Sequence, residues 1–115
     1  MTYTLSFRIR REYFDQILQG VKDREVRRRC AFWDSRVAGA AAAKRAGEDL
    51  EAVFLCGPDV HRRRVTGIQL HPNAVIALGR QPSEQGLKDV GDGQVYAFIL
   101  APPPVPPSRS YIALV

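Results

Sequence analysis

The most highly charged stretch of the chain is GVKDREVRRR, residues 20–29, in which seven of ten side chains carry a charge. If this stretch is extended, alternate side chains point to opposite faces, so Glu25, Arg27 and Arg29 share one face. One carboxylate flanked by two guanidinium groups can contact an anionic ligand, or it can form a structural ion pair at the surface. Taken alone, the residue types favour the ion pair.

The overall charge points to the kind of partner that the chain would attract. Its 115 residues carry a net charge of +5, and 45% of them are hydrophobic, which suits one domain with one core. A positive protein attracts polyanions before any specific contact forms, so nucleic acid is the first partner to consider. Many small basic proteins are merely soluble, however, and net charge alone gives no specificity.

The remaining residue types exclude several kinds of chemistry. Cys30 and Cys56 do not form a CxxC pair and have no clustered histidine nearby, so we expect free thiols and no metal site. His61 and His71 lie far apart without a catalytic pattern, so we interpret them as ordinary surface or turn residues. No P-loop or GxSxG elbow is present. We expect no cofactor. Apolar stretches are too short to span a membrane and the N-terminus has no secretory signal, which favours a cytoplasmic location.

The elements that position the charged stretch come directly before it. In residues 4–10, TLSFRIR, apolar and polar side chains alternate, which predicts a half-buried strand. In residues 11–20, REYFDQILQG, the apolar side chains change to helical spacing, and Gly20 can end that helix in the left-handed conformation. The order is therefore strand, helix and charged extended segment.

The middle of the chain predicts a helix followed by a hairpin. Residues 33–52 are rich in alanine, and Asp34 or Ser35 is a suitable helix N-cap. Residues 52–57 and 61–71 have strand character, with Gly57 to Asp59 as the turn.

The last third of the chain predicts a connection, a strand and a stiff tail. Residues 82–93 read as a surface connection, and residues 94–100 as a strand. Residues 101–108, APPPVPPS, favour extended polyproline II before a short final strand over 111–115. The tail is either a spacer, which we favour, or a ligand for a proline-binding module that would make the chain an adaptor.

The pattern as a whole resembles the ASCH domain family. The resemblance rests on FRIRREYFDQILQGVKDREVR (residues 7–27), AGEDLEAVFLCG (46–57), RRRVTGIQ (62–69) and VYAFIL (95–100). It implies an α+β, PUA-like open β-barrel of about five to six mostly antiparallel strands with two to three short helices. It also implies one domain over residues 1–101, with residues 102–115 as a proline-rich C-terminal segment.

The family places an RNA-binding or nucleotide-binding cleft beside the first helix. The matching positions here are Gly20, Lys22, Glu25 and Arg27. Lys22 would supply a mobile charge for a phosphate, and Arg27 a planar fork for phosphate or base edges. Glu25 would orient the arginine or accept a hydrogen bond from a base amino group. With the resemblance, a role in a cleft outweighs a structural ion pair.

A catalytic alternative uses the same residues. Some relatives of the family hydrolyse acetylated cytidine with a threonine three residues after the lysine, but Glu25 occupies that position here, so that activity does not transfer. Others are associated with RNA cleavage, which needs general acid and base groups near a phosphodiester. Lys22 and Glu25 are the candidate catalytic residues for an RNA-cleaving or nucleoside-processing hydrolase.

Several other residues are candidates for contact with RNA. Arg8 and Arg29 flank the expected cleft, and Trp33 could stack on an unpaired base, as could Tyr13 and Phe32, although packing in the core is the commoner fate of such side chains. The basic run at residues 61–65, HRRRV, either follows a phosphate backbone or begins an edge strand that basic residues protect from aggregation.

Overall fold

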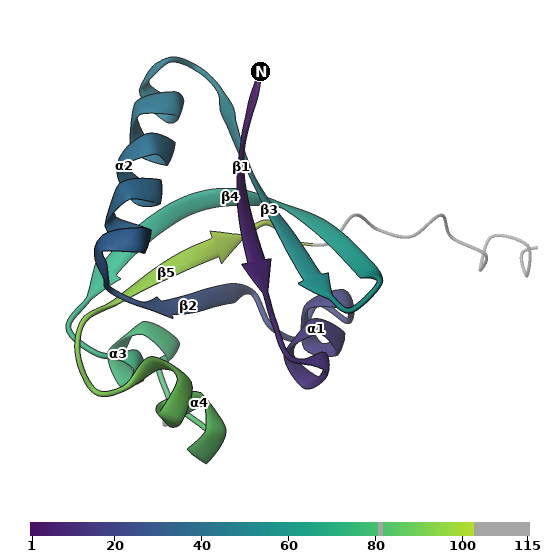
Figure 1. Cartoon of the computed structure of the whole chain (residues 1–115), viewed down its shortest axis with the longest axis vertical. Helices are drawn as coiled ribbons and strands as arrows, with labels where there is room; N and C mark the ends of the chain where they lie inside the picture. Colours follow the sequence, from purple (N-terminus) through teal and green to yellow (C-terminus); the bar gives the residue numbers. More distant parts are fainter. Residues whose placement is uncertain (81, 103–115) are drawn as a thin grey trace, which may run out of the picture.

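Strands and helices are interspersed along the chain in the computed structural model, which describes residues 1–80 and 82–102 (Figure 1). In chain order the elements are β1 (Thr2–Arg8), α1 (Arg11–Leu18), β2 (Arg24–Arg28), α2 (Ala31–Arg45), β3 (Asp49–Cys56), β4 (Asp59–His71), α3 (Ala74–Leu78), α4 (Glu84–Val90) and β5 (Val95–Leu100). Most of the predicted proline-rich tail and the predicted final strand fall outside the described residues. Among the helices described, none is long and apolar enough to cross a membrane.

All five described strands form a single mixed sheet in the order β1-β3-β4-β5-β2. β1 pairs with β3 in parallel, and the other three pairings are antiparallel. The predicted α+β class and mostly antiparallel sheet are therefore confirmed. The sheet is open, with β1 and β2 as its edges. The four helices in the described ranges exceed the two to three that were predicted.

Both faces of β5 are buried, which explains why the sequence VYAFIL is apolar throughout. Tyr96, Phe98 and Leu100 belong to a large core cluster, and Val95 and Ala97 belong to a smaller one. Successive side chains of a strand point to opposite faces, so the two clusters lie on opposite sides of the sheet. α1 packs on β3 and α2 packs on β1 and β3, while α3 packs on β2, β4 and β5.

Aromatic rings fill the centre of the large cluster. The ring of Phe7 in β1 stacks on Trp33 at a centroid distance of 5.0 Å and on Phe54 at 5.4 Å. Phe98 meets the same ring edge-on at 4.9 Å. Offset stacking and edge contacts are the favoured arrangements of aromatic pairs. This group of rings fixes β1, α2, β3 and β5 relative to one another.

α2 begins earlier than the sequence suggested. Cys30, rather than Asp34 or Ser35, is the residue before the helix, and Asp34 lies in the first turn, where a negative charge is favourable. Within the helix, Gly39 allows Tyr3 of β1 to approach closely, because a Cβ built at Gly39 would lie only 2.3 Å from the Tyr3 hydroxyl. The only glycine inside α2 therefore marks a contact with the sheet.

The predicted strands are largely confirmed, with shifted ends. β1 ends at Arg8 rather than at residue 10, and the turn predicted at Gly57 to Asp59 joins β3 to β4 as a hairpin. β3 begins at Asp49, three residues before the predicted strand. β4 is an inner strand between β3 and β5, so the suggestion that residues 61–65 begin an edge strand is wrong.

The predicted surface connection over residues 82–93 contains a helix. α4 begins after Ser83, whose hydroxyl accepts a hydrogen bond from the backbone N–H of Gly86 at 3.0 Å. None of its side chains is buried, so no apolar periodicity was present to reveal it. The short α3 was also missed; its N-cap Asn73 accepts from the N–H of Ile76. In both cases the N-cap residue was the feature of the sequence that could have predicted the helix.

Candidate functional site

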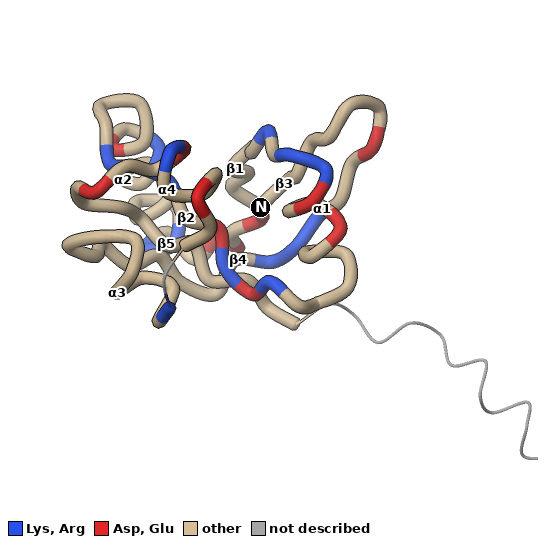
Figure 2. The backbone as a smooth tube through the Cα atoms, turned by 90° about the horizontal axis from the view of Figure 1, so that it is seen from below, with Lys and Arg blue, Asp and Glu red and all other residues tan. Residues whose placement is uncertain are grey.

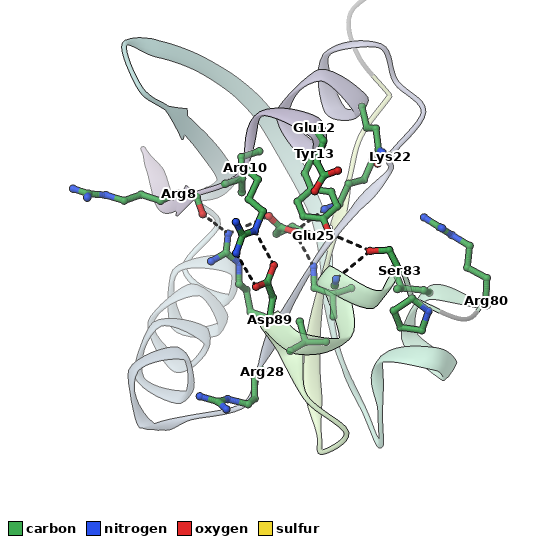
Figure 3. A pocket seen from close by; sticks show the side chains of 18 residues that line it. Arg8, Arg10, Glu12, Tyr13, Lys22, Glu25, Arg28, Arg80, Ser83 and Asp89 are labelled. Atoms are coloured by element: carbon green, nitrogen blue, oxygen red, sulfur yellow. Dashed lines mark hydrogen bonds and ion pairs between the residues drawn. The ribbon is translucent and has the colours of Figure 1, made fainter.

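The main cavity of the described residues lies between α1, β2 and α4 and has a volume of about 590 Å³ (Figure 3). The residues after β1 and the loop after α3 complete its walls. Its charged lining consists of six cationic residues, Arg8, Arg10, Lys22, Arg27, Arg28 and Arg80, and three acidic residues, Glu12, Glu25 and Asp89. Positive charge is therefore in excess, although it is interspersed with carboxylates.

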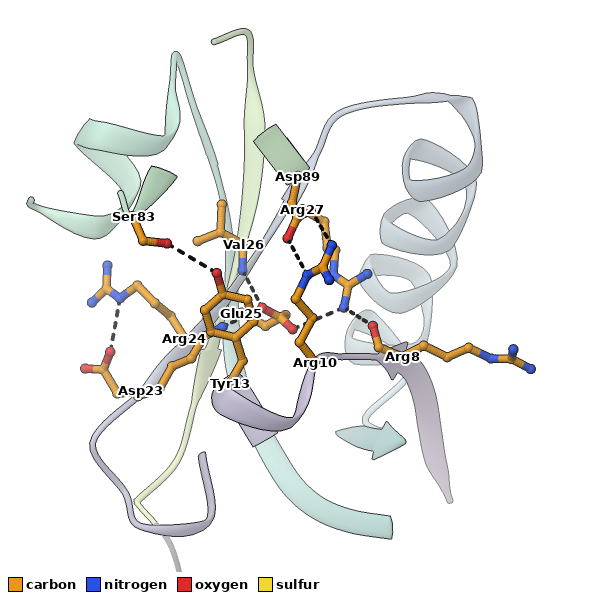
Figure 4. A network of polar contacts seen from close by, with 11 residues as sticks. Arg8, Arg10, Tyr13, Asp23, Arg24, Glu25, Val26, Arg27, Ser83 and Asp89 are labelled. Carbon is orange, nitrogen blue, oxygen red and sulfur yellow. Dashed lines mark hydrogen bonds and ion pairs between the residues drawn. The ribbon is translucent and has the colours of Figure 1, made fainter. Parts of the chain in front are cut away.

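Glu25 forms the floor of this cleft and is only 4% exposed (Figure 4). Its Oε1 accepts a hydrogen bond from Lys22 Nζ at 2.9 Å and from the Val26 backbone N–H at 3.2 Å. Its Oε2 accepts from Arg27 at 3.2 Å. A buried carboxylate is tolerated when its charge is paired and hydrogen-bonded, as it is here. We call Lys22, Glu25 and Arg27 the floor triad.

Lys22 reaches Glu25 from the turn that joins α1 to β2. The backbone N–H of Lys22 donates to the carbonyl of Gln16 in α1, which holds the turn against the helix. Its ammonium group lies 4.6 Å from the centre of the Tyr13 ring, a distance that allows a cation–π contact. The lysine is therefore held between α1 and β2 and is 14% exposed toward the cleft.

Arg27 links the two edges of the open sheet. From β2 it donates to the backbone carbonyl of Arg8, the last residue of β1, at 2.9 Å. Its guanidinium carbon lies 5.2 Å from the ring centre of Phe7 and 5.8 Å from that of Trp33. The aromatic core thus supports one side of the guanidinium group, and the other groups around it fix its orientation toward Glu25.

Two polar contacts join α1 and its preceding residue to the α4 side of the cleft. Arg10 donates two hydrogen bonds to the carboxylate of Asp89, at 3.2 and 3.1 Å. The hydrogen bonds from Arg10 lower the pKa of Asp89 below its usual range. At the other end of α4, the hydroxyls of Tyr13 and Ser83 lie 3.3 Å apart (Figure 4).

The structure separates the predicted site residues into two groups. Lys22, Glu25 and Arg27 meet at the floor, and Arg8 also lines the cleft, although its side chain points outward in Figure 3. Arg29 is not among the lining residues. It follows β2 and pairs with Asp34 at 3.1 Å instead, so the predicted pair of guanidinium groups around Glu25 is corrected to one guanidinium and one ammonium.

Arg29 belongs to a different polar contact, at the start of α2. It donates to the side-chain oxygen of Gln94 at 2.9 Å, in addition to its pair with Asp34. Asp34 also accepts a hydrogen bond from the hydroxyl of Tyr96. That hydrogen bond and, to a lesser extent, Arg29 lower the pKa of Asp34. These hydrogen bonds join α2 to β5 and lie outside the cleft, so we assign them a structural role.

Of the aromatic candidates, only Tyr13 lines the cleft. Trp33 is 8% exposed and packs in the core, which is the alternative that the sequence left open. Phe32 is exposed, and the guanidinium of Arg36 in the same helix covers its ring at 3.4 Å. Neither residue therefore offers a stacking surface to a ligand in the cleft.

The basic run at residues 61–65 is distributed over several local contacts. Figure 2 shows it as a basic segment of β4 near acidic residues. Arg62 pairs with Glu51 at 2.6 Å and Arg64 pairs with Asp49 at 3.1 Å, both across the β3–β4 hairpin. Arg63 is buried. The run is thus engaged with the protein itself and lies outside the cleft.

Sequence reasoning missed the acidic and polar wall of the cleft. Arg10, Ser83 and Asp89 were not candidates, because residues 82–93 were interpreted as a connection and no nearby pattern pairs them with α1. The sequence PSEQ, in which a serine is followed by acidic and polar residues, is a helix start that would have revealed α4. The partnership between Arg10 and Asp89 spans 79 positions and has no local signal.

The chemistry available in the cleft is that of fixed charges, donors and one ammonium–carboxylate pair. No group of histidine, cysteine, aspartate or glutamate side chains in the described ranges could hold a metal ion.

Comparison of the chain with protein-family models, curated proteins and solved structures finds no match.

Proposed function

We propose that the chain is a small ASCH-like protein with a PUA-like fold that binds RNA or a nucleotide-like ligand in the cleft between α1, β2 and α4. The observation that carries this proposal is the position of the floor triad. Three of the positions that the family resemblance points to, Lys22, Glu25 and Arg27, converge on one cleft floor, with Glu25 nearly fully buried.

The energetics of the triad support a role in binding. Ion pairs removed from water lose much of their solvation, and apolar residues of similar volume are often as stabilising. The triad contacts the main cavity instead of being sealed in the core. Charged groups held in place at such a position offer a ligand donors and an acceptor that need no reorganisation.

The size and charge of the cleft also suit a nucleotide. Small-ligand sites commonly have volumes of about 300–1,000 Å³, and the cavity of about 590 Å³ is within this range. Its lining has three more cationic than acidic residues, which favours a ligand that carries phosphate.

A hydrolase that acts on RNA or a nucleoside is the second candidate. The Lys22 ammonium lies 2.9 Å from the Glu25 carboxylate, so a proton can pass between the two groups. Both residues line the cleft, where a phosphodiester or amide of the ligand could reach them. In this case the same residues bind the ligand and transfer the proton.

Binding is tested by fluorescence anisotropy with labelled single-stranded RNA, duplex RNA and single-stranded DNA of equal length. We expect saturable binding that prefers RNA and that Lys22→Met and Arg27→Met each weaken by about tenfold, since a charge-assisted contact contributes about 1.5 kcal/mol or more. Lys44→Met and Arg62→Met are the controls, because they remove the same charges from exposed sites away from the cleft. Equal losses in all four variants would contradict the proposal.

Turnover is tested on the same RNAs by gel electrophoresis. The hydrolase candidate requires cleavage that disappears in Lys22→Met while measurable binding persists at high protein concentration. Intact RNA after prolonged incubation with saturating protein would leave binding as the function and reject cleavage. Circular dichroism of each variant shows whether the fold is retained.

A further inference from the structure

The cationic residues of the cleft fall into a paired set and an unpaired set. Lys22 and Arg27 bind Glu25, and Arg10 binds Asp89, so these three charges are largely balanced by carboxylates. Arg8, Arg28 and Arg80 also line the cleft, are exposed, and form no ion pair with any of the described residues. We call these three residues the rim arginines. They carry the charge that is available to a ligand.

The rim arginines stand at opposite sides of the cleft. In Figure 3, Arg8 and Arg28 extend to one side of Glu25 and Tyr13, and Arg80 extends on the other side. Arg8 ends β1 and Arg28 ends β2, whereas Arg80 follows α3. Three separate parts of the fold therefore place guanidinium groups, which form no ion pair with the described residues, on two sides of one floor.

The floor itself is a poor site for a phosphate. The negative charge of Glu25 repels an anion, and the two donors nearest to it already point at its carboxylate. Donors beside an acceptor, with apolar Val26, Leu78 and Val90 in the same lining, suit a flat neutral group with hydrogen-bonding edges. A nucleobase has this character, and a phosphate does not.

We infer that the ligand is an internal nucleotide of a single-stranded chain, with its base on the floor triad and its two flanking phosphates on opposite rim arginines. This inference rests on the proposed function. A free nucleoside monophosphate has phosphate on one side only and can engage one side of the rim. A strand that crosses the cleft engages both sides, so the cleft selects oligonucleotides over mononucleotides.

The experiment compares a nucleoside 5′-monophosphate with a single-stranded RNA nonamer of the same base. Affinities are measured by calorimetry for the monophosphate and by anisotropy for the nonamer, at several salt concentrations, for the wild type, Arg28→Gln, Arg80→Gln and the control Arg62→Gln. The nonamer is expected to bind at least tenfold more tightly. Each phosphate contact with a single strand contributes about −0.7 to the slope of log K against log salt.

Arg28→Gln and Arg80→Gln are each expected to weaken nonamer binding by about three- to tenfold and to make its salt slope shallower by about 0.7. Arg62→Gln, which removes an exposed charge outside the cleft, is expected to change neither quantity. Equal affinity for the two ligands, or salt slopes that are unchanged in both rim variants, would overturn the inference while the proposed function stands. Binding of neither ligand would overturn the proposed function and this inference together.

Discussion

Two charged side chains of this protein are equally buried but have different surroundings. Glu25 on β2 and Arg63 on β4 are each 4% exposed. Glu25 is bound by two cationic side chains, Lys22 and Arg27. Arg63 has no carboxylate partner among the described residues and donates instead to backbone carbonyls, those of Ile17 at 3.0 Å and of Ala101.

The difference shows that the charge of Glu25 belongs to the cleft, whereas the charge of Arg63 holds parts of the fold together. Both partners of Glu25 line the cavity and are partly exposed, at 14% for Lys22 and 26% for Arg27, so water or a ligand can reach them. The partners of Arg63 are carbonyls at the last turn of α1 and just beyond β5. Arg63 therefore joins two segments that are far apart in the sequence through hydrogen bonds to their backbone carbonyls.

The largest expected effect comes from removing Arg63. Arg63→Met removes the charge-assisted hydrogen bonds to the carbonyls of Ile17 and Ala101, and only the Ile17 carbonyl keeps a backbone donor among the described residues, the N–H of Gly20. We expect this variant to lower the free energy of unfolding by about 3 kcal/mol. Urea denaturation followed by circular dichroism at pH 7.5 measures this loss. Arg62→Met is the matched control, because that neighbour is exposed, and it is expected to change stability by less than about 0.5 kcal/mol. Equal losses of unfolding free energy in the two variants would contradict a structural role for Arg63.

A smaller effect is expected at Glu25, although its exposure is the same. Glu25→Gln keeps the shape of the side chain and removes its charge, and the two cations that it leaves can be hydrated through the cleft. We expect a loss of about 1 kcal/mol in the same urea experiment. A loss equal to that of Arg63→Met would show that the floor triad is sealed from solvent and would break the comparison.

The smallest expected effect is a pH dependence of the free energy of unfolding, which arises from His61, a near neighbour of Arg63 in β4. Burial and, to a lesser extent, the charge of Arg63 lower the pKa of His61 below its ordinary value of 6.5. The unfolded state then binds a proton that the folded state does not, so the free energy of unfolding falls as the pH is lowered from about 7 to about 5. His61→Phe removes the titrating group beside Phe14 and is expected to abolish this decrease. An unchanged decrease in that variant would assign it to another group.

Much of the fold could be predicted because its core follows local patterns. The alternation in β1, the apolar sequence of β5 and the hairpin turn at Gly57 are all visible in the sequence, and the structure confirms the corresponding elements. α4 could not be found by periodicity, since it buries no side chain. His61 was interpreted as an ordinary surface or turn residue, but it lies within β4, and its Nε2 is buried without a partner in the described part of the chain.

The site could be predicted only where its residues are close in sequence. Lys22, Glu25 and Arg27 lie within six positions, and their grouping at one floor was expected. Arg29 was assigned to the same face by strict alternation, but β2 ends at Arg28, so the alternation does not extend to it. The walls depend on contacts between distant segments, and a single sequence carries no record of such pairings.

The order of the strands also sets the order in which the molecule can be completed during synthesis. β1 and β2 come early in the chain, yet they stand at the two edges of the sheet, and the neighbour of β2 is β5 at Val95–Leu100. Glu25 lies opposite Phe98 in that pairing, so the floor triad cannot reach its final surroundings until β5 has left the ribosome. Before β5 is synthesised, β2 has no partner strand in this sheet. The dense charge of β2 discourages it from pairing with strands of other chains during that time.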